Sequence, residues 1–344
     1  MSPFRKVFFA KKPSKFLLIF NELQTCKIGF RGFRRGLNNK ARKYKFDLIM
    51  GVMKFKGSIG MLIFLFLFVA KANAQKVDKI GAGANLSKDT IPMQIVDNAK
   101  YRVYYKLTFC KDSTATDLKT EAQTVLLIGS KFSSFVDYNT LRKDSLFNAL
   151  SKTGLGTMEI VGRIMPIGRQ IKFEPTIMKN FPQKDVYTFQ QMITARDNYR
   201  YVDEGVKIKW KLEAGEKVLQ GYTCKKATCS YRGRSYVAWY CPDIAMNDGP
   251  YIFTGLPGLI LEIFDTKEHY KFTMNGLNKV TGFDPLYFAA NNVETLSRDK
   301  VRKTISNLRA NPASILQLMG GRATVSPETL KKIKPKPHNP IELE

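Results

Sequence analysis

Alternation of apolar and polar residues is the feature of this 344-residue chain that most constrains its fold. Apolar side chains occupy every second position over residues 101–109, and the same pattern recurs over 206–213 and 270–274. A period of two is typical of strands that bury one face of an antiparallel sheet. Further strands are predicted at residues 124–128, 170–177, 186–193, 222–231, 235–241 and 259–265.

Few segments have helical character. Residues 140–151 predict a helix beside the sheet, and residues 293–308 predict a second one with Asn292 as its N-cap. Residues 311–321 are expected to form a short turn bounded by Pro and Gly. We therefore expect a mainly β fold, a curved antiparallel sheet that is half-barrel-like, with a few decorating helices.

An uninterrupted apolar run covers residues 61–70. Lysines precede it and an A-x-A sequence follows it, which are the flanks of a secretory signal. The run is shorter than the roughly 20 apolar residues that span a bilayer. Residues 53–74 are thus expected to be a signal peptide cleaved between Ala74 and Gln75, the alternatives being an uncleaved anchor or a buried core helix.

The segment before this signal, residues 1–52, is basic and has no periodicity. We interpret it as an upstream extension that results from a start placed too early, with Met50 or Met53 as the initiator. A basic tail that binds nucleic acid is the alternative, which an export signal directly downstream disfavours. A single β-rich domain over 75–330 and a basic, Pro-rich tail over 331–344, extended and mobile, are expected to follow the signal.

The exported part keeps an excess of positive charge. The whole chain has a net charge of +27, and residues 1–74 hold 16 of its basic and 2 of its acidic residues, which leaves +13. Outside the cytosol this excess favours an anionic envelope component, a lipid or an acidic outer-membrane protein as partner, and no nucleic acid. A lysine-rich face that only keeps the protein soluble is the simpler alternative.

This composition and the signal predict a protein of the periplasm or outer-membrane surface, or a secreted one. No transmembrane segment is expected after processing.

Four cysteines follow the signal, an even number that permits two disulfides in an exported protein. Cys224 and Cys229 on one strand would lie about 16 Å apart at about 3.3 Å per residue. A bridge needs Cα atoms within about 7 Å. A hairpin that turns between Arg232 and Gly233 places Cys224 opposite Cys241 instead, because both are equally far from the turn. We expect a disulfide between these two residues.

The most distinctive motif precedes the predicted strand at 259–265, and it consists of Gly255, Leu256, Pro257, Gly258, Leu259 and Ile260. Trp210, Gly-Tyr-Thr-Cys at 221–224 and Gly-Pro at 249–250 stand before it, and Asn-Pro-Ile-Glu-Leu-Glu ends the chain at 339–344. With these residues in this order, the chain resembles the GLPGLI family of exported Gram-negative proteins of unknown function. The resemblance implies export and carries no established activity.

The hexapeptide has a structural explanation. Pro257 would fix φ at the second position of a type II turn, and Gly258 would accept the positive φ of the third position. The turn would then start a core strand at Leu259. A backbone-lined binding ledge is the alternative, because glycine permits close approach of a ligand. We favour the structural role, since turn chemistry accounts for every residue of the motif.

No set of residues requires catalysis. A Ser or Cys nucleophile usually needs a histidine base, and the two histidines, His269 and His338, fall in a predicted turn and in the tail. Neither a G-x-S-x-G elbow nor an H-E-x-x-H helix occurs. We therefore predict neither a metal site nor a cofactor.

The alternative is a carboxylate-dependent hydrolase that acts on envelope or extracellular glycans. Such enzymes use two carboxyl groups, and the candidates are Asp243, Asp248, Glu262 and Asp265. Glu262 lies in an apolar strand, where burial would raise its pKa.

We favour a non-catalytic exported binding or scaffold protein. A curved sheet could offer a concave apolar face to a lipid, a peptide or a partner protein. The aromatic residues expected to line this face are Tyr104, Trp239 and Tyr240. Their alternative role is that of ordinary sheet core.

Overall fold

The computed structural model describes residues 90–193, 197–312 and 333–344. The chain divides into two compact units, 1–78 and 79–344, and the description below concerns the second. The predicted upstream extension, the signal peptide and its cleavage site at Ala74 and Gln75 lie outside the described residues, as does most of the turn expected at 311–321.

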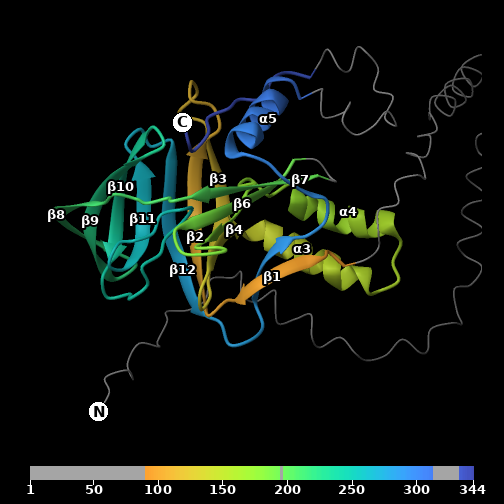
Figure 1. The fold of residues 1–344 in the computed structure, drawn as a ribbon, viewed down its shortest axis with the longest axis horizontal. Coiled ribbons are helices and arrows are strands. Elements are labelled where there is room, and N and C mark those ends of the chain that lie inside the picture. The colour runs from red at the N-terminus through yellow and green to blue at the C-terminus, as the bar shows by residue number, and fades with distance from the viewer. Residues whose placement is uncertain (1–89, 194–196, 313–332) are drawn as a thin grey trace, which may run out of the picture. The chain divides into compact units, whose positions relative to one another are not determined.

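Strands dominate the described residues, and twelve of them form one sheet (Figure 1). In chain order they are β2 (Tyr101–Cys110), β3 (Lys119–Ile128), β4 (Ser133–Asp137), β5 (Thr176–Lys179), β6 (Val186–Met192), β7 (Asn198–Glu204), β8 (Lys211–Leu219), β9 (Tyr222–Tyr231), β10 (Arg234–Cys241), β11 (Leu259–Asp265), β12 (Tyr270–Lys279) and β14 (Val293–Thr295). Their order across the sheet is β14-β7-β6-β5-β4-β3-β2-β12-β11-β10-β9-β8. Neighbours are antiparallel except β14 and β7, which are parallel.

Five further elements complete this unit. The strands β1 (Met93–Asn98) and β13 (Pro285–Ala289) form a separate antiparallel ribbon. The helices of the described residues are α3 (Tyr138–Ser151), α4 (Thr157–Gly168) and α5 (Arg298–Ala310). In Figure 1, α3 and α4 pack together beside the ribbon, and α5 lies against β7. The predicted class, a mainly β fold with a curved sheet and few helices, is confirmed.

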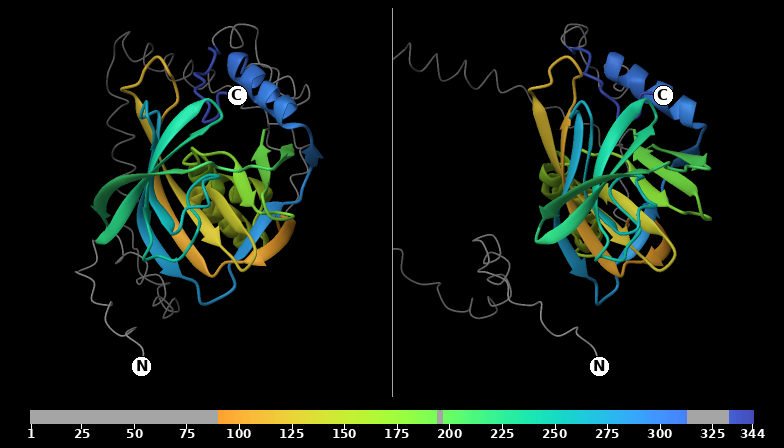
Figure 2. Two further views of the ribbon diagram at one scale, coloured as in Figure 1. Left: turned by 60° about the vertical axis from the view of Figure 1, so that its left-hand side comes forward. Right: turned by 90° about the vertical axis from the view of Figure 1, so that its left-hand side faces the viewer.

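The sheet curls around a loop between β10 and β11 (Figure 2). The rings of Phe189 on β6 and Tyr251 in this loop lie 6.3 Å apart, and those of Tyr236 on β10 and Phe253 lie 4.7 Å apart. Six strands separate β6 from β10, so only a strongly curled sheet lets both reach one loop. Each fully buried side chain of this inner core stabilises the fold by about 1.5–3 kcal/mol.

The two faces of the sheet carry separate cores. On β2 the inner face holds Val103, Tyr105, Leu107 and Phe109, as the alternation predicts. The outer face of β3, β4 and β5 packs against the β1–β13 ribbon and α3, and its buried members are Val125, Leu127, Val136, Met178, Leu286 and Phe288. We call these two surfaces the inner face and the outer face.

The helices differ from the expected ones in instructive ways. Helix α3 begins at its N-cap Asp137, whose carboxylate accepts a hydrogen bond from Asn139 N. Helix α4 was not predicted, because its Gly162 and Pro166 are poor helix formers. Helix α5 is capped by Ser297 and not by the predicted Asn292, since residues 293–295 join the sheet as β14.

Two predicted strands are shorter than expected. Of residues 170–177, only the last two belong to β5, because the backbone N–H groups of Lys172 and Phe173 bind the Asp137 carboxylate at 2.9 and 3.1 Å. Residues 206–210 lie outside β8, and Trp210 bonds to a loop instead. The predicted strands 222–231 and 259–265 match β9 and β11.

The predicted Cys224–Cys241 disulfide is not formed. The hairpin register is the predicted one, with Arg234 opposite Tyr231, but the β9–β10 pairing ends one residue before the two cysteines. Cys241 pairs with Leu259 of β11, and Cys224 Sγ turns along its own strand toward Tyr222 O at 3.6 Å. The four cysteines of the described residues are free, buried thiols.

Candidate functional site

The hexapeptide forms a corner directly before β11. Gly258 N donates to Leu256 O over 2.8 Å, which closes a three-residue γ-turn around Pro257 and not the predicted type II turn. Gly258 has φ of +144°, so the expectation of a positive φ at this glycine is confirmed. Leu259 N bonds to Ile244 O at 3.1 Å, which leaves no hydrogen bond for a four-residue turn.

Backbone crowding explains why residue 258 is glycine. A Cβ at this position would lie 2.1 Å from Cys241 O and 2.9 Å from Pro242 Cα. The space that glycine opens is therefore filled by the chain itself. This packing favours the structural role of the motif over a ligand ledge.

Trp210 and the hexapeptide form one packed unit. Trp210 Nε1 donates to Thr254 O at 2.8 Å, and the indole ring lies 3.9 Å from the Cβ position at Gly255, whose φ is +93°. Tyr105 of β2 donates through its hydroxyl to Ile260 O at 2.7 Å. Leu256, Leu259 and Ile260 are buried in the inner core. Two sequence landmarks that are far apart along the chain thus meet at this corner.

Three of the four candidate carboxylates form ion pairs within the fold. Lys179 Nζ donates a hydrogen bond to Asp248 Oδ1 at 2.6 Å. Lys179 is fully buried and also donates to Gly249 O. Burial lowers the pKa of the Lys179 ammonium, and the Asp248 carboxylate opposes this shift. Asp265 binds Arg234 at 2.9 Å, and Asp243 is exposed to solvent.

The Glu262 carboxylate also has cationic partners: its oxygens lie 2.5 Å from Lys217 Nζ and 3.1 Å from Lys271 Nζ. Burial alone would raise the pKa of Glu262, but hydrogen bonds from both lysines outweigh it and lower the pKa, contrary to the sequence expectation. Glu262 and Asp265 are three positions apart on β11 and so point to opposite faces. These two carboxylates therefore do not form an acid–base pair on one face of the sheet.

The C-terminal segment, residues 339–344, packs on the domain and is not a free tail. The buried guanidinium of Arg234 donates to Asn339 Oδ1 and Pro340 O at 2.7 Å each, and to Ile341 O at 3.0 Å. Glu342 accepts a hydrogen bond from Tyr251 at 2.6 Å and pairs with Arg298 of α5 at 2.5 Å. The segment ties β10 to α5.

A pocket of about 490 Å³ lies between the inner face, α5 and residues 338–342. Its floor is apolar and mostly aromatic, and consists of Leu107, Phe109, Phe189, Tyr201, Tyr251 and Tyr270. Two ring pairs are stacked, Phe189 on Tyr201 with centroids 4.6 Å apart and Phe109 on Tyr270 at 5.6 Å. Val301 and Ile305 of α5 close the side. We call this the inner pocket.

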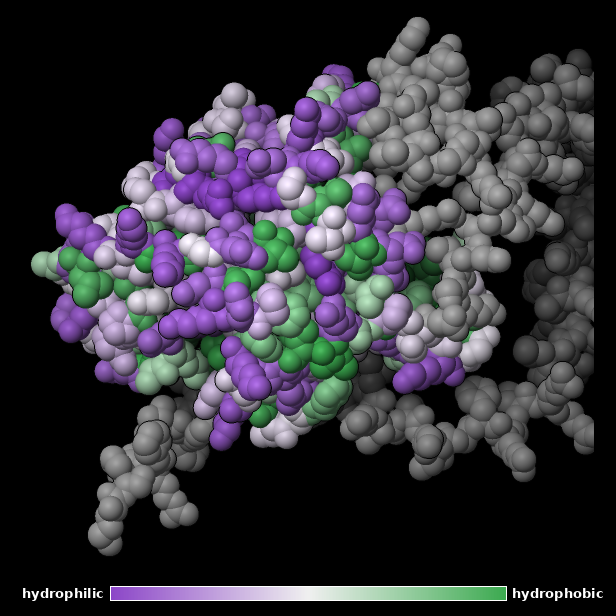
Figure 3. All heavy atoms as spheres, viewed as in Figure 1, coloured by the Kyte–Doolittle hydropathy of each residue, from purple (hydrophilic) through white to green (hydrophobic). Residues whose placement is uncertain are grey.

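Basic residues surround the inner pocket, and we call Lys172, Arg302, Lys303 and Arg309 the basic rim. Lys172 and Lys303 form no ion pair with any residue that the structure describes. The acidic lining residues are already engaged, Glu174 by Arg309 at 3.5 Å and Glu342 by Arg298. Figure 3 shows hydrophilic residues gathered over α5 and the C-terminal segment.

The rim shifts the titration of its neighbours. Burial lowers the pKa of His338 below its ordinary 6.5, and Arg309 and Arg302 lower it further. Burial likewise lowers the pKa of Lys111 near this rim, with repulsion from Lys172 and Arg309 adding to it. His338 is therefore neutral at neutral pH, and the local field favours an anion.

The three predicted binding aromatics do not share a face. Tyr104 packs edge-on against Tyr138 of α3 at 5.7 Å on the outer face. Trp239 lies 5.6 Å from Lys217 Nζ, whereas its neighbour Tyr240 is buried in the inner core. Adjacent strand residues point to opposite sides, so Trp239 and Tyr240 could not have lined one surface.

The described residues contain neither a helix long and apolar enough to cross a membrane nor a cluster of three potential metal ligands. His269 lies 3.3 Å from Arg234, and burial lowers its pKa. No nucleophile is bonded to it among the described residues.

Comparison with known proteins adds a family match over part of the chain. Residues 231–262 match a family described as "Protein of unknown function (Porph_ging)", a stretch that includes β10, the loop and the hexapeptide. No curated protein matches the chain.

Two solved structures of PNGF-II, in space groups P21 and C2, have TM-scores of 0.43 and 0.42 and 14% identity. They cover 61% of this chain, which spans 34% and 33% of theirs, about a third of their length.

Proposed function

We propose that this protein is an exported binding protein of the GLPGLI type that holds an anionic amphiphile in its inner pocket. The amphiphile would carry an acyl chain and a carboxylate, sulfate or phosphate head group. The observation that carries the proposal is an aromatic floor beneath a rim in which Lys172 and Lys303 form no ion pair with a described residue, although Lys172 Nζ donates to Arg169 O at 2.6 Å. One end of such a ligand needs an apolar environment, and the other needs positive charge.

The floor suits an acyl chain. The volume of the inner pocket, about 490 Å³, falls within the range of about 300–1,000 Å³ for ligand pockets. Each methylene removed from water contributes about 0.8 kcal/mol, so a long chain gains more than a short one. Two of the three tyrosine hydroxyls of the floor are bonded to protein, Tyr251 to Glu342 and Tyr270 to Asn339 O, so neither is left unpaired beside an acyl chain.

The rim suits an anionic head group. Lys172 and Lys303 offer ammonium groups that no described carboxylate neutralises. Arg309 adds a guanidinium whose ion pair with Glu174 is long, at 3.5 Å. A guanidinium can bind a carboxylate or phosphate through two hydrogen bonds. Affinity for a head group should therefore depend on its charge.

Export is supported by the predicted signal over residues 53–74, and we place the protein in the periplasm, on the outer membrane or outside the cell. The hydrolase alternative lacks support from the site, since Asp248, Glu262 and Asp265 each bind a cation of their own. A role as a scaffold for an outer-membrane protein would leave the inner pocket without a ligand.

Displacement of a fluorescent fatty acid tests the proposal. Dodecyl sulfate should compete at least about tenfold better than dodecanol, because only the sulfate engages the basic rim. Lys172→Gln with Lys303→Gln should reduce sulfate binding and leave dodecanol unchanged. Lys300→Gln removes one positive charge from an exposed position of α5 outside the pocket and is the control for each of the two substitutions made singly. Equal affinity for both ligands, or none, contradicts the proposal.

A further inference from the structure

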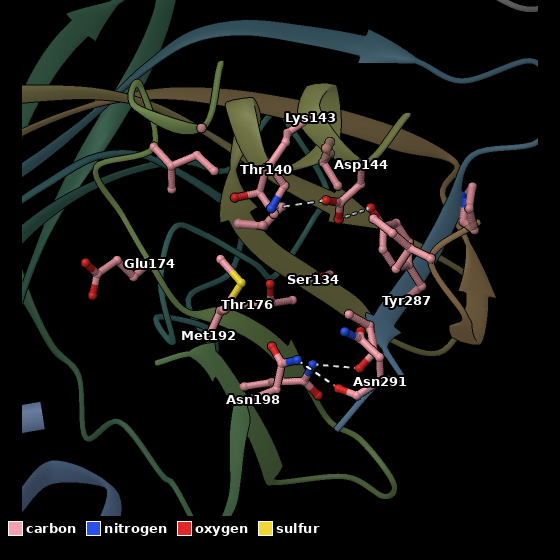
Figure 4. A pocket seen from close by; sticks show the side chains of 18 of the residues that line it. Ser134, Thr140, Lys143, Asp144, Glu174, Thr176, Met192, Asn198, Tyr287 and Asn291 are labelled. Carbon is pink, nitrogen blue, oxygen red and sulfur yellow. Dashed lines mark hydrogen bonds and ion pairs between the residues drawn. The ribbon is translucent and has the colours of Figure 1, made fainter. Parts of the chain in front are cut away.

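A second pocket of about 300 Å³ lies on the outer face, between α3, the strands β4, β5 and β6, and β13 of the ribbon (Figure 4). We call it the outer pocket. It belongs to the opposite side of the sheet from the inner pocket, since Leu127 and Val136 that line it belong to the outer core. Glu174 is the only residue that lines both, among those the structure describes.

The acidic side chains that line the outer pocket are both paired, Asp144 with Lys143 and Glu174 with Arg309, which lies outside the pocket. Asp144 of α3 is nine-tenths buried, accepts a hydrogen bond from the Tyr287 hydroxyl at 3.0 Å and pairs with Lys143 Nζ at 3.3 Å. Figure 4 shows Lys143, Asp144 and Tyr287 side by side along one wall. No cation is left over for an anionic ligand, because Lys143 is the pocket's only lysine or arginine among the described residues.

The facing wall is a fixed frame of amides. Asn198 donates through Nδ2 to Asn291 O at 2.9 Å, as Figure 4 shows. Gln190 donates to Ala289 O at 2.8 Å and accepts from Arg200 at 3.0 and 2.7 Å. These bonds orient the amides before any ligand arrives, which is how specific polar sites avoid an ordering cost.

Three hydroxyls remain for a ligand. Ser134 on β4, Thr140 on α3 and Thr176 on β5 line the pocket, and the hydroxyl of none of them has a hydrogen-bond partner in the described part of the chain. Free hydroxyls that converge on one space are donors and acceptors for a ligand with several hydroxyl groups of its own.

Apolar side chains make up the rest of the lining, and they include Ile91, Leu127, Val136, Leu141 and Met192. A pyranose ring has both surfaces, because its hydroxyls point outward around the ring while its C–H groups form apolar patches. The volume is at the lower end of the range for ligand pockets, which favours a single ring over a longer chain.

We propose that the outer pocket binds a neutral monosaccharide, either free or as the end unit of a glycan. The lining has two acidic residues and one lysine, which is already paired, so it disfavours phosphates and uronic acids, and the hydroxyls and amides disfavour an acyl chain. This site is separate from the amphiphile site and does not depend on it.

Saturation-transfer NMR on the full-length protein tests the proposal with glucose, galactose and N-acetylglucosamine as probes. At least one should receive saturation, and glucuronate should compete for it at least about tenfold more weakly. A methyl glycoside that binds as well as its free sugar identifies a glycan end as the ligand. A methyl glycoside that fails identifies a free sugar.

Substitution then locates the site. Thr176→Val keeps the shape of the side chain and removes one hydroxyl, and it should weaken binding about fivefold. Thr108→Val on β2 removes a hydroxyl of the same kind at a half-buried strand position outside both pockets. This control should bind like the wild type.

Two results would overturn the proposal: no saturation of any of the three sugars, or binding that Thr176→Val leaves unchanged. A melting temperature equal to that of the wild type shows that the variant is folded. Dodecyl sulfate displacement at the inner pocket should be unaffected by Thr176→Val, so failure of this inference and failure of the amphiphile site are distinguishable.

Discussion

Arg234 of β10 donates a hydrogen bond from Nη2 to Oδ1 of Asn339, 105 positions later, at 2.7 Å. Both side chains are buried, and the same guanidinium binds Asp265 and two backbone oxygens of the C-terminal segment. Asn339 in turn donates to Cys110 O at 3.0 Å. One arginine therefore connects β10, β11 and the chain end beside the inner pocket.

We expect Arg234→Ala to lower the free energy of unfolding by about 3–5 kcal/mol, because it leaves the buried Asp265 carboxylate without its cation. Urea denaturation measures the loss. Arg163→Ala breaks only the exposed pair to Glu159 and should cost less than about 0.5 kcal/mol. If the two variants lose equal stability, the buried bonds of Arg234 contribute less to stability than their geometry indicates.

Gly258→Ala should destabilise the protein by about 3 kcal/mol or more, since the added methyl meets Cys241 backbone and the positive φ is strained. Gly282→Ala is the control, because a Cβ there has no atom within 4 Å. Thermal unfolding of both variants checks the prediction. A Gly258→Ala protein as stable as the wild type would show that the corner can relax.

Local patterns predicted the β9, β10 and β11 strands near one edge of the sheet well. The β9–β10 hairpin has its predicted register because the turn at Arg232 and Gly233 sets the pairing of both strands. β11 matches residues 259–265 because Pro257 and Gly258 end the preceding loop. Both features depend on residues close in sequence.

The inner pocket could not be predicted in this way. Tyr251 has φ of +55° in an irregular loop, where no periodicity signals burial. The sequence of the C-terminal segment predicts a polar tail, because its contact with Arg234 depends on the fold. Only the basic residues of α5, seen as an amphipathic helix, could have pointed to the rim. Contacts between residues this far apart in the chain cannot be predicted from a short stretch of sequence.

The Glu262 carboxylate predicts a pH dependence of stability. Its folded pKa is lowered from 4.5, so its contribution is present above pH 4.5 and is lost as pH falls through the folded pKa. Glu262→Gln should cost about 1 kcal/mol at neutral pH, a small value because Lys217 and Lys271 are partly exposed. Urea denaturation of both proteins should show this difference shrinking in acid. A difference that grows in acid would contradict the ion pairs.

Binding at the inner pocket should strengthen in acid. The pKa of His338 is lowered by burial and by Arg309 and Arg302, so protonation below pH 6.5 adds a positive charge beside the basic rim. An alkyl sulfate stays ionised over this range, so its affinity reports the protein alone. His338→Gln should flatten the profile, and bound sulfate should raise the pKa of His338 seen by NMR. A profile that His338→Gln leaves unchanged would assign the effect to another group.

Thiol counting tests both the cysteine chemistry and the predicted loss of the segment that contains Cys26. Burial raises the pKa of Cys224 to about 11 and that of Cys229 to about 12, so neither forms much thiolate at neutral pH. Iodoacetamide should modify these two slowly in the folded protein and quickly in urea. Protein purified from the envelope should expose four thiols on unfolding without reductant, because a start at Met50 or Met53, or cleavage after Ala74, leaves it without Cys26. Five thiols would show that the upstream segment with Cys26 is retained, and two would show that a disulfide forms in the cell.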